Sequence, residues 1–311
     1  MKACFSLLAV TFFLLPALSH ANILVGGDSV YTVRKGDSME LIGARLGISW
    51  KRIMRENRLD PQKPLKKGMT LRVNTRRIVP TVLDNGIIVN IPDKTLYFMK
   101  DGQVESLFPV ALGMVPQKDS SDWTTPLGKF RVLMKQKHPS WYVPKSIQAK
   151  MEEEGKPVES IVSPGPDNPL GRYAIKTSLP GILIHETISP WSVFHFRSHG
   201  CIRVMPEHME GFFGKVAVNT PGQVIYKPIK IALSEEGRIF IEIHGDPYKK
   251  VRDLKAAVKA EVDQYGLSDS VDWQKIGEAM KEKSGIPLDI TADHNKTYQS
   301  RRELHGQRRT D

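Results

Sequence analysis

Apolar positions near the front of the chain change from strand to helix spacing and back again. Residues 31–35 form a short β-prone run that ends at a glycine turn. Apolar residues then recur at helical spacing over 41–46 and again over 50–54, and a second β-prone run follows at 67–73. These patterns predict a small unit with the order strand, helix, helix, strand.

The middle of the chain is dominated by short apolar runs separated by glycine, proline and polar residues. Two helical patterns interrupt them, at 146–154 and 206–213. Many short strands with few helices predict a mainly β or α+β domain, built as a β-sandwich or barrel-like sheet with helical insertions. The predicted strands are 87–91, 95–99, 104–111, 128–133, 173–176, 182–185, 223–226 and 238–243.

The last third of the chain returns to helical spacing. We expect residues 229–291 to form a strand hairpin followed by a helical extension. Its helices lie near 248–265 and 272–283, each with one apolar face that should pack on the strand-rich domain. Residues 292–311 are polar and basic, and we expect a disordered tail there.

Residues 1–21 have the pattern of a cleavable signal peptide. Lys2 precedes an apolar core from Phe5 to Leu15, and Ser19-His20-Ala21 forms a small-x-small cleavage site. This core is shorter than the roughly 20 residues needed to span a bilayer, which disfavours the alternative of an uncleaved anchor. No later stretch is apolar enough to span a membrane, so we expect an exported mature chain without a membrane span.

Charge and length narrow the class of protein further. The chain of 311 residues has a formal net charge of +11, which removal of Lys2 with the signal peptide lowers to +10. A basic exported protein is attracted to polyanionic envelope surfaces. Nucleic acid is a less favoured partner, because no basic helix is interleaved with aromatic residues. The length predicts two domains, the larger with a core that needs no disulfide.

The residues best suited to chemistry lie around Cys201. Cys4 falls in the segment expected to be removed, so Cys201 has no disulfide partner within the chain. A lone thiol in an exported protein is either buried and inert or a nucleophile. His185 ends an apolar strand and is placed to act as the base, and Gly200 allows backbone N–H groups to approach an oxyanion.

Two alternatives to catalysis remain for these side chains. His185 and Cys201 are also compatible with inert core positions. A zinc site from Cys201, His185, His195 and His199 is less favoured, because closed zinc sites prefer several thiolates at clearer spacings. We expect no metal and no organic cofactor, because a thiolate, an imidazole and oxyanion donors are sufficient for nucleophilic chemistry.

The front unit, residues 30–75, resembles a LysM domain. The resemblance rests on YTVRKGDS at 31–38, Asn57 and KKGMTLRV at 66–73. It implies binding of N-acetylglucosamine-containing glycan on two loops, with contacts from Gly36, Asp37, Ser38 and Asp60; a structural spacer is the alternative. Residues 76–84 are expected to be a linker.

Residues 84–226 resemble the L,D-transpeptidase (YkuD) catalytic domain, for which we assign 85–228. The matching motifs are TPLGKF at 125–130, WYVP at 141–144, PGPDNPLG at 164–171, SPWSV at 189–193 and SHGCIR at 198–203. The resemblance implies a mixed β-sandwich whose catalytic cysteine and histidine lie under a loop flap.

The resemblance also assigns roles to individual residues. Cys201 is the nucleophile, His185 the base, and Gly200 a backbone donor to the oxyanion. The main-chain carbonyl of Glu186 orients the imidazole. Further residues are expected at the substrate: Ser198, His199, Arg203 and Trp191, of which Arg203 fits equally well as support for the loop.

The chain departs from the family pattern at two places. Many relatives have glycine where this chain has Glu186, and a carboxylate there would raise the pKa of the histidine or narrow the acceptor channel. Phe194-His195-Phe196-Arg197 replaces the small residues that often precede the signature serine. Both departures bear on the choice of acyl acceptor.

The two resemblances together imply a periplasmic peptidoglycan L,D-transpeptidase that carbapenems acylate. Its partners would be the glycan and stem peptides of peptidoglycan, with a second stem, an outer-membrane lipoprotein or a free D-amino acid as acyl acceptor. Two alternatives stay open. The same acyl-enzyme resolved by water would make a carboxypeptidase or amidase, and a chain with inactive machinery would be a non-catalytic wall-binding protein.

Overall fold

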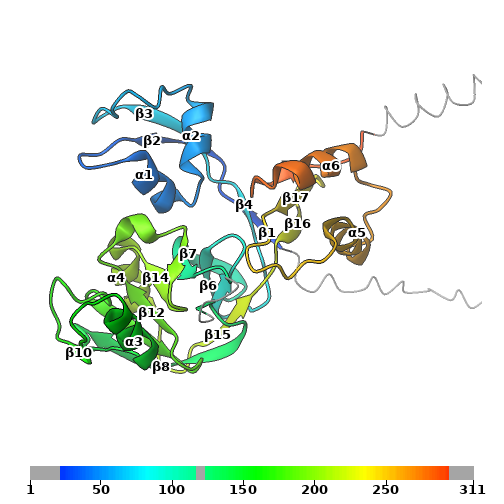
Figure 1. The fold of residues 1–311 in the computed structure, drawn as a ribbon. Helices are drawn as coiled ribbons and strands as arrows, with labels where there is room; N and C mark the ends of the chain where they lie inside the picture. Colours follow the sequence, from blue (N-terminus) through cyan, green and yellow to red (C-terminus); the bar gives the residue numbers. More distant parts are fainter. Residues whose placement is uncertain (1–21, 117–122, 294–311) are drawn as a thin grey trace, which may run out of the picture.

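A computed structural model describes residues 22–116 and 123–293 of the chain. The predicted signal peptide, and all but the first two residues of the predicted tail, lie outside these residues. Three units are visible in Figure 1: a small one at the N-terminal side, a large strand-rich one, and a smaller one at the C-terminal side. In the described residues no helix combines the length and the apolar character that a membrane crossing requires.

The front unit has the predicted order of elements. Its four elements are β2 (Asp28–Thr32), α1 (Met39–Leu46), α2 (Trp50–Glu56) and β3 (Thr70–Asn74). β2 and β3 pair antiparallel, and the two helices pack on them around the fully buried Ile42, Ile53 and Leu71. The Ser38 side chain accepts a hydrogen bond from the amide of Leu41 and so caps α1.

The strand-rich unit is a single nine-stranded sheet that closes on itself. Its order is β13-β7-β14-β12-β11-β8-β15-β5-β6, and β6 also pairs with β7. The strands are β5 (Gly86–Asn90), β6 (Thr95–Lys100), β7 (Gln103–Gly113), β8 (Gly128–Lys137), β11 (Tyr173–Thr177), β12 (Leu183–Glu186), β13 (Phe196–Ser198), β14 (Ile202–Val204) and β15 (Pro221–Ile225). The mixed, β-rich fold predicted from the sequence is confirmed.

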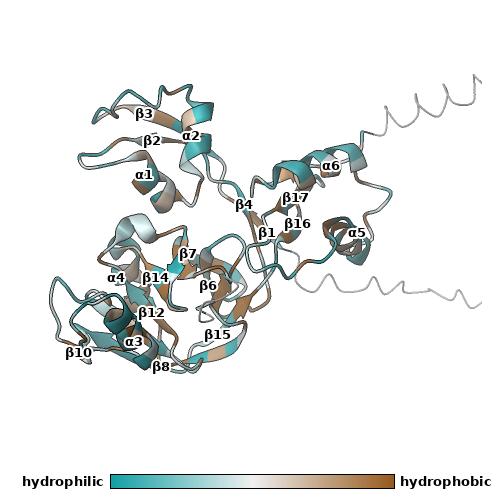
Figure 2. Ribbon diagram, viewed as in Figure 1, coloured by the Kyte–Doolittle hydropathy of each residue, from teal (hydrophilic) through white to brown (hydrophobic). Residues whose placement is uncertain are grey.

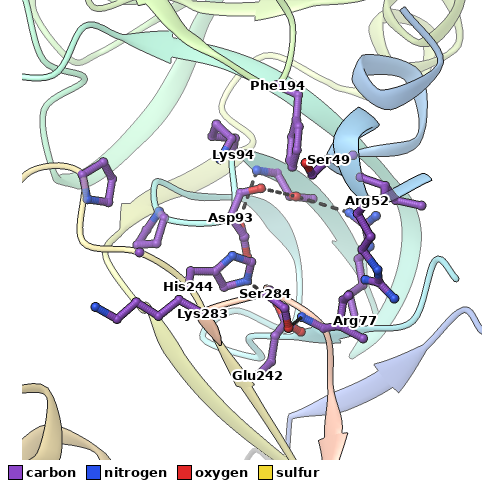
Figure 3. A pocket seen from close by; sticks show the side chains of 18 of the residues that line it. Ser49, Arg52, Arg77, Asp93, Lys94, Phe194, Glu242, His244, Lys283 and Ser284 are labelled. Carbon is purple, nitrogen blue, oxygen red and sulfur yellow. Dashed lines mark hydrogen bonds and ion pairs between the residues drawn. The ribbon is translucent and has the colours of Figure 1, made fainter. Parts of the chain in front are cut away.

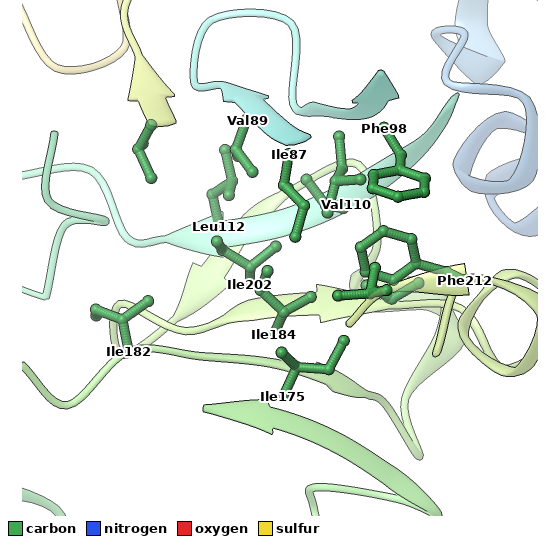
Figure 4. Packing of buried hydrophobic residues seen from close by; sticks show 14 of the residues in the cluster. Ile87, Val89, Phe98, Val110, Leu112, Ile175, Ile182, Ile184, Ile202 and Phe212 are labelled. Carbon is green, nitrogen blue, oxygen red and sulfur yellow. The ribbon is translucent and has the colours of Figure 1, made fainter. Parts of the chain in front are cut away.

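The long strand β7 makes the closure. Its first half pairs with β6 as far as Pro109, and its second half pairs with β14 and β13. The apolar faces of both halves of the sheet therefore meet in one core, where Ile87, Val110 and Ile184 are completely buried (Figure 4). Figure 2 shows that apolar residues concentrate in the strands, whereas the helices are more polar.

Helices and short strands decorate this sheet. α4 (Pro206–Lys215) confirms the second predicted helix and places Met209 and Phe212 in the core. α3 (Lys145–Glu153) confirms the first, and lies between the short paired strands β9 (Trp141–Tyr142) and β10 (Ile161–Val162). No residue of α3 is fully buried, which suits an insertion that covers the sheet from outside.

The C-terminal unit has a core of its own. β16 (Ile229–Leu233), β17 (Ile239–Ile243) and β18 (Leu288–Asp289) form a three-stranded sheet, and α5 (Leu254–Gln264) and α6 (Trp273–Glu282) pack on it. The expectation that these helices pack on the strand-rich domain is wrong. Their apolar faces are covered by the strand hairpin that precedes them, which is also the element nearest in sequence.

The segment 76–84 is more than a linker. It contains β4 (Arg77–Val79), which pairs antiparallel with β1 (Ile23–Val25) next to the C-terminal unit. Ile78 is fully buried against Ala232 and Phe240. The charged Arg76 and Arg77 make this stretch look like a linker in the sequence. Its buried residues Ile78 and Val79 nevertheless connect the front unit to the C-terminal unit.

Candidate active site

The pairing of β12 with β14 brings Cys201 and His185 together. Ile184 lies opposite Ile202 in this parallel pair, and both are completely buried in the core. Because side chains alternate along a strand, His185 points to the other face of the sheet. Cys201, which directly precedes Ile202, points to that same face. The β12–β14 pairing therefore places the two expected catalytic side chains on the same face of the sheet, opposite to the core.

The histidine is held as a neutral base. Its Nδ1 lies 2.7 Å from the main-chain oxygen of Glu186. A carbonyl oxygen only accepts hydrogen bonds, so Nδ1 carries the proton and Nε2 keeps its lone pair. His185 is 3% exposed, and this burial lowers the pKa of the imidazole to about 4 against the opposing effect of backbone carbonyls. At neutral pH the ring is uncharged.

The thiol is also neutral at rest. Cys201 is partly buried, its Sγ accepts the amide N–H of Leu183 at 3.4 Å, and it lies 3.6 Å from the carbonyl oxygen of Gly181. Burial raises the pKa of the thiol, while the Leu183 amide and the charge of Arg203 act in the opposite direction. Both side chains are thus uncharged at rest.

Gly200 fixes the direction of the backbone beside Cys201. Its φ of +104° lies in a region that favours glycine, and a side chain there would meet Ile182 Cδ1 at 3.0 Å. Thr125 donates its hydroxyl to the carbonyl oxygen of Gly200 at 2.9 Å. In a trans peptide the carbonyl and the following N–H point in opposite directions. Holding this carbonyl therefore aims the N–H of Cys201.

Thr125 belongs to a buried network that sequence reasoning missed. Its hydroxyl accepts the amide N–H of Gly113 at 2.8 Å, and its own amide donates to the hydroxyl of Tyr248 at 3.1 Å. Tyr248 in turn donates to the carbonyl oxygen of Gly113 at 2.8 Å. Thr125 belongs to the TPLGKF motif, which is the sequence feature that could have pointed to this network. Tyr248 lies outside every motif, in the loop between β17 and α5 of the C-terminal unit.

Ser198 supports the catalytic loop. It is 1% exposed, and its hydroxyl donates to the carbonyl oxygen of Cys201 at 2.5 Å. This bond closes the turn around the thiol from inside the loop, and the substrate contact expected for Ser198 stays a prediction. The side chain of His199 makes no comparable bond: among the described residues, its buried Nε2 has no hydrogen-bond partner. Its ring packs edge-on against Trp123, with 4.1 Å between the ring centroids.

Glu186 points away from the imidazole chemistry. Its carboxylate is 6% exposed and makes two contacts of 3.1 Å with the guanidinium of Arg172. The expectation that this carboxylate raises the pKa of His185 is wrong, since the pKa is lowered by burial and Arg172 compensates the negative charge. Only the main-chain carbonyl of Glu186 faces the ring.

Arg203 and Trp191 are the remaining residues that the sequence places at the substrate. Arg203 lies opposite His185 in the β12–β14 register, on the thiol's face of the sheet. No ion pair of the described residues uses its guanidinium, so its charge is free for an anionic group. Trp191 lies in the short helix η1 (Pro190–Ser192), is 56% exposed, and has the guanidinium of Arg197 at 5.7 Å from its ring.

The front unit carries a groove at the predicted glycan loops. The groove has a volume of about 1030 Å³ and is lined by residues of both loops, among them Ser38 and Asp60, and by Trp50. The Asp37 side chain is 2% exposed and accepts hydrogen bonds from Arg45 and Tyr31. Asp37 therefore anchors its loop, although it also lines the groove. Gly36 (φ +86°) makes the turn beside it.

Comparison with known proteins identifies two domains. Residues 84–226 match the YkuD family, the L,D-transpeptidase catalytic domain, and residues 31–74 match the LysM domain. The chain therefore combines a region similar to a LysM domain with a region similar to an L,D-transpeptidase catalytic domain. The assignment agrees with the motifs around His185 and Cys201 and with the βααβ order of the front unit.

Two curated relatives align with this chain over more than nine tenths of both lengths. The chain is 27% identical over 295 residues to the probable L,D-transpeptidase YbiS of Escherichia coli, covering 92% of this chain and 93% of the relative. It is 28% identical over 295 residues to the probable L,D-transpeptidase ErfK/SrfK of Salmonella typhimurium, covering 92% of both. The catalytic domain of the E. faecium L,D-transpeptidase is 21% identical, with a TM-score of 0.33, over 46% of this chain and 99% of that one.

Proposed function

We propose that the chain is an exported enzyme of the periplasm that cross-links peptidoglycan through a thioester on Cys201. The observation that carries the proposal is the pairing of a neutral His185, with Nδ1 tied to the Glu186 carbonyl, and a neutral thiol on one face of the sheet. Thiol, base and backbone donors supply acyl transfer without metal or organic cofactor.

The acylation step uses each of these groups once. His185 Nε2 takes the proton as Sγ attacks the carbonyl between the L-centre of diaminopimelate and the terminal D-alanine of a tetrapeptide stem. The oxyanion forms at the N–H groups near Gly200 and Cys201. The imidazolium then gives the proton to the amine of D-alanine, the amide bond breaks, and a thioester remains.

Resolution reverses the proton path. An amine of a second stem attacks the thioester carbonyl while His185 accepts its proton, and the C–S bond breaks to restore the thiol. The product is a 3–3 cross-link, or an attached lipoprotein or D-amino acid if these supply the amine. The thioester conserves the energy of the broken amide, so the exchange needs no nucleotide.

Arg203 and the groove of the LysM domain suit the two halves of the substrate. Arg203 offers a cation near the thiol for a carboxylate of the stem peptide. The groove of the front unit offers Trp50 and the polar rim residues Ser38 and Asp60 for glycan. Holding the polymer at a second site raises the local concentration of stems at Cys201.

The products of disaccharide-tetrapeptide turnover test this function. Mass spectrometry should detect dimers that lack one D-alanine, and Cys201→Ala should abolish them while leaving the melting temperature within a few degrees. Tripeptide without dimers would assign the chain to hydrolysis instead. Activity that survives Cys201→Ala would remove the thioester mechanism.

A further inference from the structure

A cavity lies where the three units meet, away from the catalytic cysteine. It has a volume of about 390 Å³ and is lined by residues of α2, the β4 segment, the loop before β6, and the C-terminal unit (Figure 3). This volume is in the range of small-molecule sites. Nothing in the transpeptidase chemistry described above uses it.

The acidic residues of the cavity are already compensated. Asp93 and Glu242 each lie 2.7 Å from the ammonium of the fully buried Lys230. Glu242 also contacts the Nε2 of His244 at 2.5 Å. Asp246 accepts the Tyr226 hydroxyl and two backbone N–H groups. These acids are turned to internal partners and leave little negative charge for a ligand.

A metal ion is not the favoured occupant. Ligand atoms of Asp93, Glu242 and His244 lie within 4.8 Å of one another, which is a metal-compatible cluster. The ammonium of Lys230 already provides the positive charge between the two carboxylates. A divalent cation would have to displace this buried lysine, whose pKa is raised by the same carboxylates.

Among the basic residues of the cavity, Arg52 is paired with Glu56, and three others lack a carboxylate partner in the part of the chain that the structure describes. Within residues 22–116 and 123–293, no ion pair uses Arg76, Arg77 or Lys94. Arg77 donates only to the hydroxyl of Thr95 and to main-chain oxygens. Lys94 lies against the rings of Phe194 and Phe196 at 4.4 and 5.2 Å. Its desolvation lowers its pKa to about 8.

We propose that this cavity binds a small organic oxyanion, with a carboxylate or phosphate group at Lys94, Arg76 and Arg77 and its apolar part against Phe194. The three cations come from two different units, and the C-terminal unit supplies the opposite wall (Figure 3). An anion there provides the countercharge that the protein lacks, so binding should also hold the units together.

Calorimetric titration of the full mature chain carrying Cys201→Ala tests the site. One arm uses inorganic phosphate, and the other uses a diaminopimelate-containing tripeptide, both at constant ionic strength. Lys94→Gln should weaken binding of the active probe roughly tenfold, which is the value of one charge-assisted contact. Lys255→Gln, which removes the same charge from an exposed position of α5, should leave it unchanged.

Arg76→Gln gives a second, independent variant should Lys94→Gln lower the melting temperature without ligand. Binding in one arm alone tells a phosphate from a carboxylate source, and both outcomes support the site. Absence of binding in both arms would overturn the proposal. So would binding in Lys94→Gln and Arg76→Gln that is as strong as in the protein without these two substitutions. Because Cys201 is absent from the test protein, the result is separate from the proposed transpeptidation.

Discussion

The protonation states of His185 and Cys201 bear directly on the proposed reaction. Burial lowers the pKa of His185 and raises that of Cys201, so both shifts oppose a resting thiolate–imidazolium pair. We therefore expect the site to operate by general-base transfer, with an imidazole that remains unprotonated at pH values where an ordinary histidine is charged.

The pH dependence of acylation follows from these pKa values. An ordinary histidine loses its lone pair as the pH falls through about 6.5, whereas His185 should keep it down to a pH of about 4. The rate at which a carbapenem labels Cys201 should stay level from pH 7 to pH 5 and fall only below that. Stopped-flow or intact-mass kinetics measure it. A midpoint near 6.5 would show that the base is not the buried imidazole.

Thr125 gives a second prediction at this scale. Thr125→Val leaves the Gly200 carbonyl and the Gly113 amide without their shared partner, which should cost about 1–3 kcal/mol of stability. It should also slow acylation, because the Cys201 N–H loses its fixed direction. Thr125→Ser keeps the hydroxyl and is the matched control. Thermal unfolding and carbapenem labelling measure both effects, and equal results for the two variants would contradict the assignment.

The sequence predicts the elements that hold His185 and Cys201, but not how these elements pair. The strand at Leu183–Glu186 and the loop before Ile202 were predicted, because strand periodicity and local motifs are properties of neighbouring residues. The parallel pairing of these elements was not, since register depends on contacts between distant segments. The same reason explains why the closing role of β7 and the strand character of Arg77–Val79 were missed.

Tyr248 shows this limit for a functional residue. It belongs to the segment after β17, yet its ring lies in the core of the catalytic domain and its hydroxyl binds Gly113 and Thr125. No local pattern distinguishes it from an exposed loop tyrosine. Its role arises from the way the C-terminal unit folds back on the sheet.

Removal of this hydroxyl should affect turnover more than binding. Tyr248→Phe keeps the ring and removes two hydrogen bonds behind the oxyanion loop, so kcat should fall about two- to tenfold with little change in KM. Tyr265→Phe, which removes a hydroxyl within the C-terminal unit, is the control. Steady-state D-alanine release measures both. Equal kcat for Tyr248→Phe and the unmodified enzyme would leave the tyrosine only a packing role.

The whole molecule joins the glycan-binding unit to the catalytic domain by direct contact. α1 packs Leu41 and Ala44 against Val193 and Met205 of the catalytic domain. Arg45 binds Asp37 of the glycan loop at 2.8 Å and Glu207 of α4 at 2.6 Å. The groove is therefore held in one orientation relative to the catalytic domain, and β4 ties the same unit to the C-terminal one.

Sacculus binding tests the groove without disturbing these contacts. Truncation before Val79 would remove the buried Ile78, so a point variant is the better probe. Asp60→Ala should reduce co-sedimentation with intact sacculi several-fold at high salt, where long-range charge attraction is screened. Asp269→Ala, an exposed acid elsewhere, should have no effect. Unchanged sedimentation of Asp60→Ala would remove Asp60 from the glycan site.

The most direct test of the account is detection of the thioester itself. The enzyme is mixed with disaccharide-tetrapeptide in the absence of acceptor, quenched in acid, digested and analysed by mass spectrometry. The peptide that contains Cys201 should gain the mass of the donor minus D-alanine, and His185→Gln should accumulate far less of it. Cross-linked product formed while Cys201 stays unlabelled, or a label on another residue, would contradict the account.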